Sequence, residues 1–427
     1  MSLALTEEHL ALADSVRGWA GHTAPAATIR SVVDAEDHGA ALYRDTLRPG
    51  LAAQGLLGLH LPEALGGQGF GLPELVVATE ELARALVPGG FLPTVLAGAI
   101  LARAIDGAAD GTDTSAQEGL VKELAAGTLT AAVGLGPGLS ATPGDGGGLV
   151  IDGTCGPVTG AGMADLLILP AGQSEARAWV AVEAGDVTLT PLDSMDLTRP
   201  VARVSLSKVP VPAGRVLSGL PHGLVPGLAA TLFAAEACGI AAWAVDTAAS
   251  YAKIRHQFGR PIGQFQAVKH RCAWMLTASE QAAAVAWDAA RAWAEPAGTQ
   301  PAGDGGRDFA AGAAATVAID AAVTCAHECI QVLGGIGYTW EHDAHLYYRR
   351  ALSLRALAGT SAAWAGEVAR LALGGSTRSL AVELPEEAAA VRAGVTEELA
   401  AIAAAPKAGQ ARLLADGGWV TPHLPAP

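Results

Sequence analysis

Residues 251–262 read YAKIRHQFGRPI and separate two long, alanine-rich apolar segments. Around this stretch, residues 247–279 contain five lysine and arginine side chains and no acidic residue, in a chain whose formal net charge is −15. A helix that leads into such a basic turn suits a phosphate or pyrophosphate ligand. A solvated basic helix face, or a contact between subunits, would explain the same pattern.

The composition of the 427-residue chain limits the class of protein. Hydrophobic residues make up 51% and charged residues only 16%, which excludes a disordered or collagen-like chain. The acidic net charge argues against a nucleic-acid binder. Five cysteines do not make a disulfide framework. The length fits roughly two to four domains with a sizeable core.

The sequence predicts neither a signal peptide nor a membrane span. Its first residues, MSLALTEEHLALADSVRGW, lack a basic segment before an apolar core. The longest apolar stretch, residues 228–245, is rich in alanine and carries Glu236 at its middle. Because alanine is only weakly hydrophobic, this stretch is expected to be a helix buried in protein. We therefore expect a soluble, cytoplasmic protein.

The distribution of patterns predicts an α+β protein that is mainly α. Thr6 before Glu7 and Glu8, and Pro73 before Glu74, are typical helix starts in a helical N-terminal domain, residues 1–125. A small β domain over residues 126–222 and a helical C-terminal domain over residues 223–376, a four-helix bundle by the resemblance given below, follow. The predicted strands include residues 149–151, 166–169, 179–182 and 201–206, and a Gly/Pro-rich interruption at 295–306 separates two C-terminal helices.

A short internal repeat suggests a fourth segment. Residues 51–63 read LAAQGLLGLHLPE, and residues 414–426 read LADGGWVTPHLPA, with six of thirteen positions identical. A chance match is the alternative. If the repeat is genuine, residues 377–427 begin a second copy of the N-terminal domain, and the sequence is that of an incomplete protein.

Glu236 is the first candidate for chemistry. It is the only charged residue between positions 228 and 245. A carboxylate inside a buried helix is costly unless it is paired, and such groups are often general acids or bases. A structural ion pair with one of the following arginines is the alternative.

A glycine-rich segment, residues 331–337, is a second candidate. It reads QVLGGIG, and its glycines would let the backbone approach a ligand or another chain closely. An ordinary helix end is the alternative. Cys325, His327 and Cys329 do not make a zinc site, because alternate residues point to different helix faces. No other metal site, P-loop or dinucleotide fingerprint is found.

Together these motifs resemble the acyl-CoA dehydrogenase family over residues 1 to about 375. The family has a helical domain, a β domain and a four-helix C-terminal domain, usually in dimers of dimers, which agrees with the order of elements expected above. The motifs are LPE and GGQG within residues 61–69, EELAR at 80–84, YAKIRHQFGRPI with QFQ within 251–266, and QVLGGIGYTWEH with RR within 331–350.

The resemblance implies an FAD site and its residues. FAD would lie between the β domain and the C-terminal helices, with its ADP part crossing to a neighbouring subunit. Thr159 would lie beside the flavin ring, and Thr360 would make a late flavin contact. The remaining residues would contact the pyrophosphate of a neighbour's FAD (Arg255, Gln257 and Phe258) or line its adenosine path (Gln266, Gln331, Gly334 and Gly335).

The implied reaction is α,β-dehydrogenation of an acyl-CoA thioester. A carboxylate removes the α proton while the β hydride moves to flavin N5, in a dry pocket. Here the sequence departs from the family. Its two usual base positions hold Ala358 and Ala229. Glu236 follows Ala229 by about two turns on the same helix face, so Glu236 is the predicted base.

Further features of the resemblance concern partners. Ala-Ala-Glu at residues 234–236 is similar to a subgroup that acts on bulky CoA thioesters, including steroid side chains, often as heteromeric or fused two-copy enzymes. Electron-transfer flavoprotein is the implied electron acceptor, and an acyl-CoA oxidase is a third alternative. Residues 133–140 lack the family's usual flavin-loop sequence. A second hypothesis is therefore a non-catalytic half that supplies structure and part of a partner's FAD site.

Overall fold

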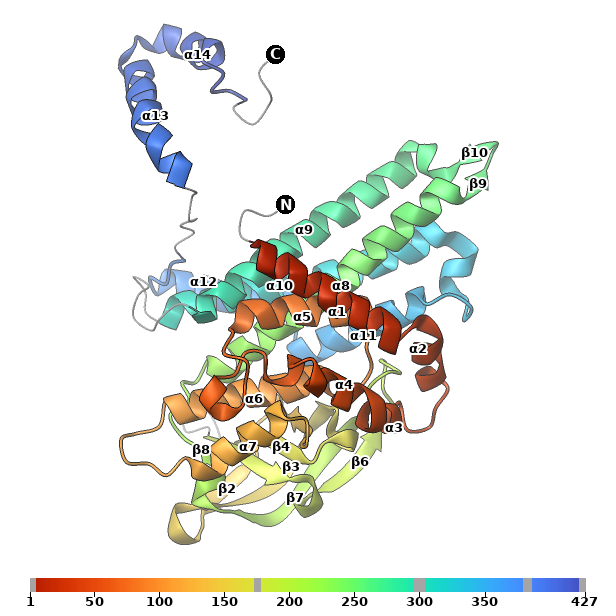
Figure 1. The fold of residues 1–427 in the computed structure, drawn as a ribbon, viewed down its shortest axis with the longest axis vertical. Coiled ribbons are helices and arrows are strands. Elements are labelled where there is room, and N and C mark those ends of the chain that lie inside the picture. The colour runs from red at the N-terminus through yellow and green to blue at the C-terminus, as the bar shows by residue number, and fades with distance from the viewer. Residues whose placement is uncertain (1–4, 173–177, 295–303, 379–385, 422–427) are drawn as a thin grey trace. The chain divides into compact units, whose positions relative to one another are not determined.

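The computed structural model describes residues 5–172, 178–294, 304–378 and 386–421. The chain forms two compact units, Met1–Arg378 and Ser379–Pro427. Within the first unit, helices precede and follow a small region of β-sheet (Figure 1). The predicted α+β fold with mostly helical structure is confirmed.

The N-terminal helices begin where the sequence predicts. In α1 (Glu7–Thr23), the Thr6 side chain accepts a hydrogen bond from the backbone N–H of His9, whose ring accepts one from the N–H of Thr6. At the start of α5 (Leu72–Arg84), the Glu74 carboxylate accepts from the Gly71 N–H at 2.8 Å. The other elements are α2 (Ala26–Val33), α3 (Ala40–Leu42), η1 (Tyr43–Leu47), α4 (Arg48–Ala53), η2 (Leu56–Gly58), η3 (Glu63–Leu65), α6 (Phe91–Asp106) and α7 (Ser115–Ala125).

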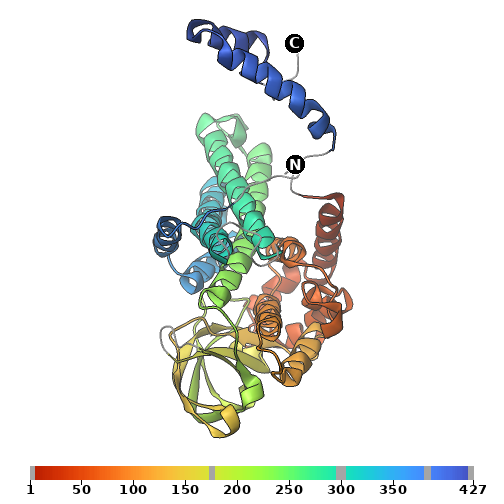
Figure 2. The same ribbon diagram turned by 90° about the vertical axis from the view of Figure 1, so that its left-hand side faces the viewer.

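Two four-stranded sheets form the β region. Their strand orders are β1-β4-β5-β8 and β2-β3-β7-β6. Among the described strands, β1 and β4 pair in parallel and the other neighbours pair antiparallel. Figure 2 shows the sheets packed face to face, and Leu167 and Val204 are among the buried side chains between them. All four predicted strand segments lie in strands. The strands are β1 (Ala131–Val133), β2 (Ser140–Pro143), β3 (Leu149–Thr159), β4 (Leu166–Ala171), β5 (Ala178–Glu183), β6 (Thr188–Leu192), β7 (Val201–Val211) and β8 (Val216–Leu217).

Long helices make the C-terminal part of the first unit. α8 and α10 are long and apolar enough to cross a membrane, but 83% and 67% of their most apolar windows are buried in the protein. The expected buried helix over residues 228–245 is therefore found in α8. Its end continues through the short pair β9 (His256–Gln257) and β10 (Arg260–Pro261) into α9. The helices are α8 (Leu224–Ile254), α9 (Gln266–Ala294), α10 (Asp304–Leu333), α11 (Ala344–Ala358) and α12 (Ser361–Leu373).

A glycine lets α8 cross α5 closely. A Cβ added at Gly239 would lie 2.1 Å from the backbone oxygen of Glu80 and 2.8 Å from the Cβ of Ala83. No side chain fits at that separation. The close crossing fixes the N-terminal helices against α8, the helix that carries Glu236.

The second unit contains α13 (Glu386–Ala404) and α14 (Lys407–Asp416). Ile402 is buried within this unit, and the Trp419 indole donates a hydrogen bond to the Glu398 carboxylate at 3.0 Å. α14 ends at Asp416 and α4 ends at Ala53, which are equivalent positions in the sequence repeat. Residues 422–426 of the repeat lie outside the described residues. The boundary at residue 377 and the second copy stay predictions.

Candidate active site

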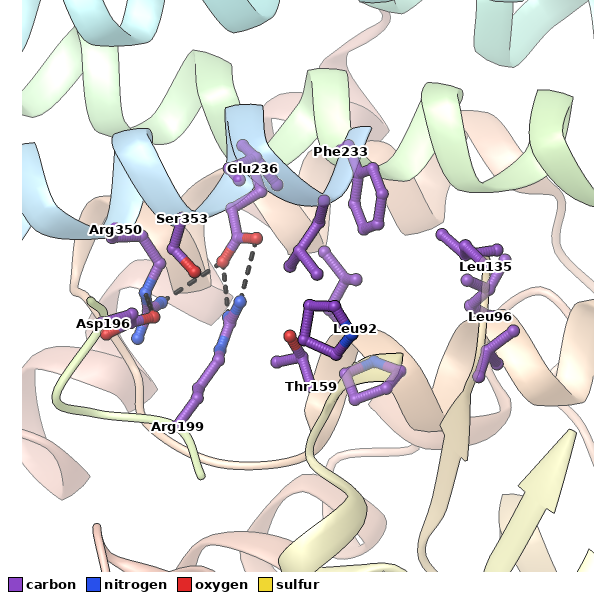
Figure 3. A pocket seen from close by; sticks show the side chains of 15 residues that line it. Leu92, Leu96, Leu135, Thr159, Asp196, Arg199, Phe233, Glu236, Arg350 and Ser353 are labelled. Atoms are coloured by element: carbon purple, nitrogen blue, oxygen red, sulfur yellow. Dashed lines mark hydrogen bonds and ion pairs between the residues drawn. The ribbon is translucent and has the colours of Figure 1, made fainter. Parts of the chain in front are cut away.

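A pocket with one charged and one apolar end lies where the three regions of the first unit meet (Figure 3). Glu236 of α8 and Arg350 of α11 line its charged end, together with Arg199 from the loop between β6 and β7. Its volume is about 40 Å³, which accommodates only a few water molecules. Apolar side chains line the other end: Leu92, Leu96, Val133, Leu135, Phe233, Leu354 and Leu357.

Both oxygens of the Glu236 carboxylate are occupied by guanidinium groups. Arg199 donates from Nη1 to Oε2 at 3.0 Å and from Nη2 to Oε1, and Arg350 Nη1 donates to Oε1 at 3.2 Å. The Glu236 side chain is only 1% exposed. Removal of a substrate proton by Glu236 would require these hydrogen bonds to be broken or rearranged.

A second acid completes a neutral, buried ionic network. Asp196 Oδ2 lies 2.7 Å from Arg350 Nε, and Asp196 Oδ1 accepts hydrogen bonds from the N–H and hydroxyl of Thr198. Burial alone would raise the pKa of Asp196, but Arg350 and Arg199 together hold it below its ordinary value. Arg350 also donates to the backbone oxygen of Val87. The network therefore joins all three regions of the unit.

The contacts of Glu236 bear on both roles that the sequence predicts for it. The expected alternative, an ion pair with a following arginine, is present, because Arg350 follows Glu236 in the chain. The second partner, Arg199, precedes it and was missed. A buried glutamate signals that a cation must lie nearby, but no sequence spacing identifies an arginine in a distant loop. Whether Glu236 also acts as a base stays a prediction.

Ala229 and Ala358, the two positions where the resemblance places a base, line one neighbouring pocket. Its volume is about 120 Å³, and it shares Leu135, Phe233 and Leu357 with the first pocket. Among the described residues, no ionisable side chain lines it. The fold thus brings both usual base positions to one place, which is apolar in this chain.

The two predicted flavin-ring residues lie on different elements. Thr159 ends β3 and lines the first pocket, and its buried hydroxyl has no hydrogen-bond partner among the described residues. Thr360 caps α12, where its hydroxyl accepts from the N–H of Ala363 at 3.2 Å. An unpartnered buried hydroxyl fits a polar edge of a cofactor. However, both pockets are far smaller than the roughly 300–1,000 Å³ of ordinary small-molecule sites.

The predicted nucleotide-binding residues gather at the far end of α8. Arg255, Gln257 and Phe258 form the exposed turn after α8, with Phe258 91% exposed, and Gln266 begins α9. Arg255 follows Glu236 by 19 residues, which is about 28 Å along a helix. These side chains are therefore far from the pocket of their own chain, and their exposure fits a ligand held by another chain.

The glycine-rich segment lies at the same end of the bundle. Val332 and Leu333 at the end of α10 pack in one cluster with Ala252 near the end of α8. Gly334, which follows α10, has a φ of +66°, as is common where a helix ends, and a Cβ there would meet open space. Gly335 and Gln331 are exposed. The segment is thus a helix end with an open surface.

The comparisons with known proteins agree with this architecture. Residues 6–127 match the N-terminal domain of acyl-CoA dehydrogenases, and residues 228–373 match their C-terminal domain. Acyl-CoA dehydrogenase IpdE2 of Mycobacterium tuberculosis is 35% identical over 346 residues, which cover 81% of this chain and 91% of IpdE2. The chain belongs to the acyl-CoA dehydrogenase family. Enzymes of this family are oxidoreductases that act on CH–CH groups.

Another relative is longer than this chain. Acyl-CoA dehydrogenase FadE34 of Mycobacterium tuberculosis is 40% identical over 433 residues, which cover all of this chain and 56% of FadE34. The chain therefore spans little more than half the length of FadE34.

Two solved acyl-CoA dehydrogenases share the fold. The Tcur3481-Tcur3483 steroid acyl-CoA dehydrogenase G363A variant superposes with a TM-score of 0.76 at 28% identity, covering 86% of this chain and 98% of that one. The ChsE4-ChsE5 complex from Mycobacterium tuberculosis gives 0.76 at 26% identity, covering 87% and 99%. The predicted likeness to steroid acyl-CoA dehydrogenases is confirmed.

Proposed function

We propose that this chain is one half of an FAD-dependent acyl-CoA dehydrogenase and that the catalytic base belongs to the other half. The observation that carries this proposal is that no position expected to hold the base has a free carboxylate. Ala229 and Ala358 line an apolar pocket, and Glu236 is held by two guanidinium groups. A base must be free to accept the α proton, and these positions offer no free carboxylate.

FAD, when bound, supplies the acceptor for the hydride that leaves the β carbon. The residues that would hold it are those at the far end of α8 and α10, above all Arg255 with Gln257 and Phe258. Their exposure and charge suit the pyrophosphate of an FAD whose flavin end lies in a partner copy. The small pockets beside Thr159 argue against a flavin ring in this half.

The partner copy, substrate and location follow from the relatives. FadE34 is nearly twice as long as this chain, and the sequence repeat supports the proposal that residues 377–427 begin a second copy. A fused or heteromeric two-copy enzyme is therefore proposed. The steroid enzyme among the structural neighbours favours a bulky, steroid-like acyl-CoA. Electron-transfer flavoprotein is the proposed electron acceptor, in the cytoplasm.

One observation favours a second candidate function, in which this half is itself catalytic with Glu236 as its base. Glu236 lines the same small pocket as Thr159, the expected neighbour of the flavin ring. In this case substrate binding would have to withdraw Arg199 and Arg350 from the carboxylate. The two candidate functions differ in whether this chain alone holds flavin and in how Glu236→Gln changes the rate of turnover.

Two measurements separate them. The purified chain should be folded by circular dichroism and show no absorbance in the flavin bands. In the two-copy enzyme, Glu236→Gln should retain flavin and turn over a steroid side-chain CoA thioester with a ferrocenium acceptor at a rate within about threefold of the parent. Loss of turnover by about a thousandfold, in a variant that is still folded and still holds flavin at the assay temperature, would instead establish Glu236 as the base.

The matched control is Glu123→Gln, an exposed glutamate on α7 that lines neither pocket. It should leave the flavin spectrum and the turnover unchanged. Comparison with this control separates an effect of the Glu236 network from a general effect of a lost surface charge.

A further inference from the structure

A cavity of about 480 Å³ lies between α1, α5 and α9, apart from the pocket of Glu236. Both α1 and α9 pack on α5 (Figure 1). The volume falls in the range of roughly 300–1,000 Å³ that is usual for small-molecule sites. Most of its wall is apolar: Leu5, Leu10, Ala13, Val76, Val77, Ala283, Ala284, Ala286 and Trp287.

The cations that line this cavity are already neutralised. Arg17 donates to the Glu81 carboxylate at 2.8 and 2.7 Å, in a bidentate pair. Arg84 is paired with Asp246 of α8. Neither guanidinium is therefore free to hold an anionic ligand. Glu81 is likewise not free to bind a cation, because it is paired with Arg17.

Glu80 differs from these paired groups. It lines the cavity, and its carboxylate makes no hydrogen bond or ion pair with any described residue. Glu280 of α9, which also lines the cavity, adds a second carboxylate without such a partner among the described residues. These carboxylates therefore have no counter-charge in direct contact, although Arg84 and Arg17 lie near Glu80.

Trp287 defines the aromatic part of the wall. The ring of His9 contacts it edge-on, at 4.9 Å between ring centroids, and His9 is itself held by Glu74 at 3.1 Å. An indole ring and carboxylates that line the same cavity are a favourable environment for an organic cation. The apolar wall suits the hydrocarbon body of such a cation and disfavours a hydrated metal ion, which prefers several oxygen ligands.

We propose that this cavity binds a small organic cation with an apolar body, an aromatic or alkyl ammonium, with Glu80 as its counter-ion. The ammonium would approach Glu80 and Glu280, and the apolar body would pack along α1 and Trp287. This site is separate from the dehydrogenase pocket and does not depend on the function proposed for that pocket.

Calorimetric titration of the full chain with 2-phenylethylammonium tests the proposal. We expect saturable binding of one ligand per chain, at least about tenfold tighter than binding of 2-phenylethanol, which has the same body without charge. Equal affinity for the two compounds, or no binding of the cation, would overturn the proposal.

Two substitutions locate the binding. Glu80→Gln keeps the side-chain shape and should weaken the cation at least about tenfold, because a charged partner is lost. Ala13→Phe should fill the cavity and weaken both compounds. The matched control, Glu123→Gln, removes an exposed charge outside the cavity and should leave binding unchanged. Undiminished binding to Glu80→Gln would place the cation elsewhere.

Binding should also depend on pH. Burial, with repulsion from Glu81 and Glu280, raises the pKa of Glu80 to about 7, against the opposing charges of Arg84 and Arg17. Cys238 of α8 and His9 of α1 are the other titratable groups nearby. Because only the ionised carboxylate attracts the cation, affinity should fall several-fold between pH 8 and pH 6. Affinity that stays constant over this range would contradict the role of Glu80.

Discussion

Glu236 of α8 and Arg350 of α11 face one another in the centre of the first unit, with Arg350 Nη1 3.2 Å from Glu236 Oε1 and both side chains 1% exposed. Arg199 and Asp196 complete a network with two positive and two negative groups. Buried ion pairs of this kind contribute little net stability when intact, because desolvation offsets the attraction. Removal of one member is different, since the remaining charges lose their compensation.

Arg350→Met is therefore expected to destabilise the protein strongly. It would leave Glu236 and Asp196 buried with Arg199 as their only guanidinium partner, at a cost of about 3–5 kcal/mol. Calorimetry of the full chain should show a large fall in the melting temperature of the main transition. Arg44→Met is the matched control, because Arg44 pairs with Asp45 on an exposed surface and its loss should leave the melting temperature almost unchanged. Similar effects of the two changes would contradict the buried network.

The titration of Glu80 predicts an unusual dependence of stability on pH. Its pKa is raised to about 7 in the folded protein by burial and by repulsion from Glu81, so folding favours the protonated form. That contribution is fully present below the unfolded pKa of about 4.5 and is lost as the pH rises toward 7. Glu80→Gln, which is always neutral, should stabilise the protein by as much as about 3 kcal/mol at pH 8 and hardly at all at pH 4.

Urea unfolding at the two pH values checks this prediction. The exposed control Glu123→Gln should change the free energy of unfolding by less than about 0.5 kcal/mol at either pH. A gain for Glu80→Gln that is the same at pH 4 and pH 8 would mean that the carboxylate does not titrate as proposed.

The sequence predicted the fold far better than the site, for a physical reason. Helix starts such as Thr6, and strands such as residues 149–151, depend on local spacing, and local spacing is visible in one sequence. The carboxylate of Glu236 was recognised because an isolated charge interrupts an apolar helix. Its partner Arg199 lies in a loop between two strands, and only the packing of three regions brings it to α8. Long-range contacts of this kind leave no periodic signal in the chain.

The predicted cofactor residues also show that distances between remote parts of the chain cannot be read from the sequence. The motifs that contain Arg255 and Gln331 were recognised in the sequence. Their distance from the pocket of Thr159 follows from the structure, in which α8 is a single helix of 31 residues. The cavity beside Glu80 gave no sequence signal at all, because Glu80 and Glu81 resemble an ordinary solvated helix face.

The burial of the cysteines predicts that their thiols react slowly in the folded protein. No disulfide is formed among the described residues, and four of the five cysteines, Cys155, Cys238, Cys325 and Cys329, are buried. Burial raises the pKa of Cys325 and of Cys329 to about 12, so almost no thiolate is present at neutral pH. The native protein should react with a thiol-specific disulfide reagent at most at one half-buried position, Cys272, and only slowly. Guanidinium chloride should release all five thiols, and rapid native reaction of more than one would contradict the burial.

A pair of glycines tests the crossing of α5 and α8. At Gly239 a Cβ would lie 2.1 Å from the Glu80 carbonyl oxygen, so Gly239→Ala must push α8 away from α5. We expect a loss of about 2–4 kcal/mol, or failure to fold. Gly366 lies inside α12 with nothing within 4 Å of an added Cβ, and Gly366→Ala should stabilise the protein by about 0.5–1 kcal/mol through helix propensity alone. Thermal unfolding of both variants gives effects of opposite sign if the crossing is as close as described, and a neutral Gly239→Ala would show that it is not.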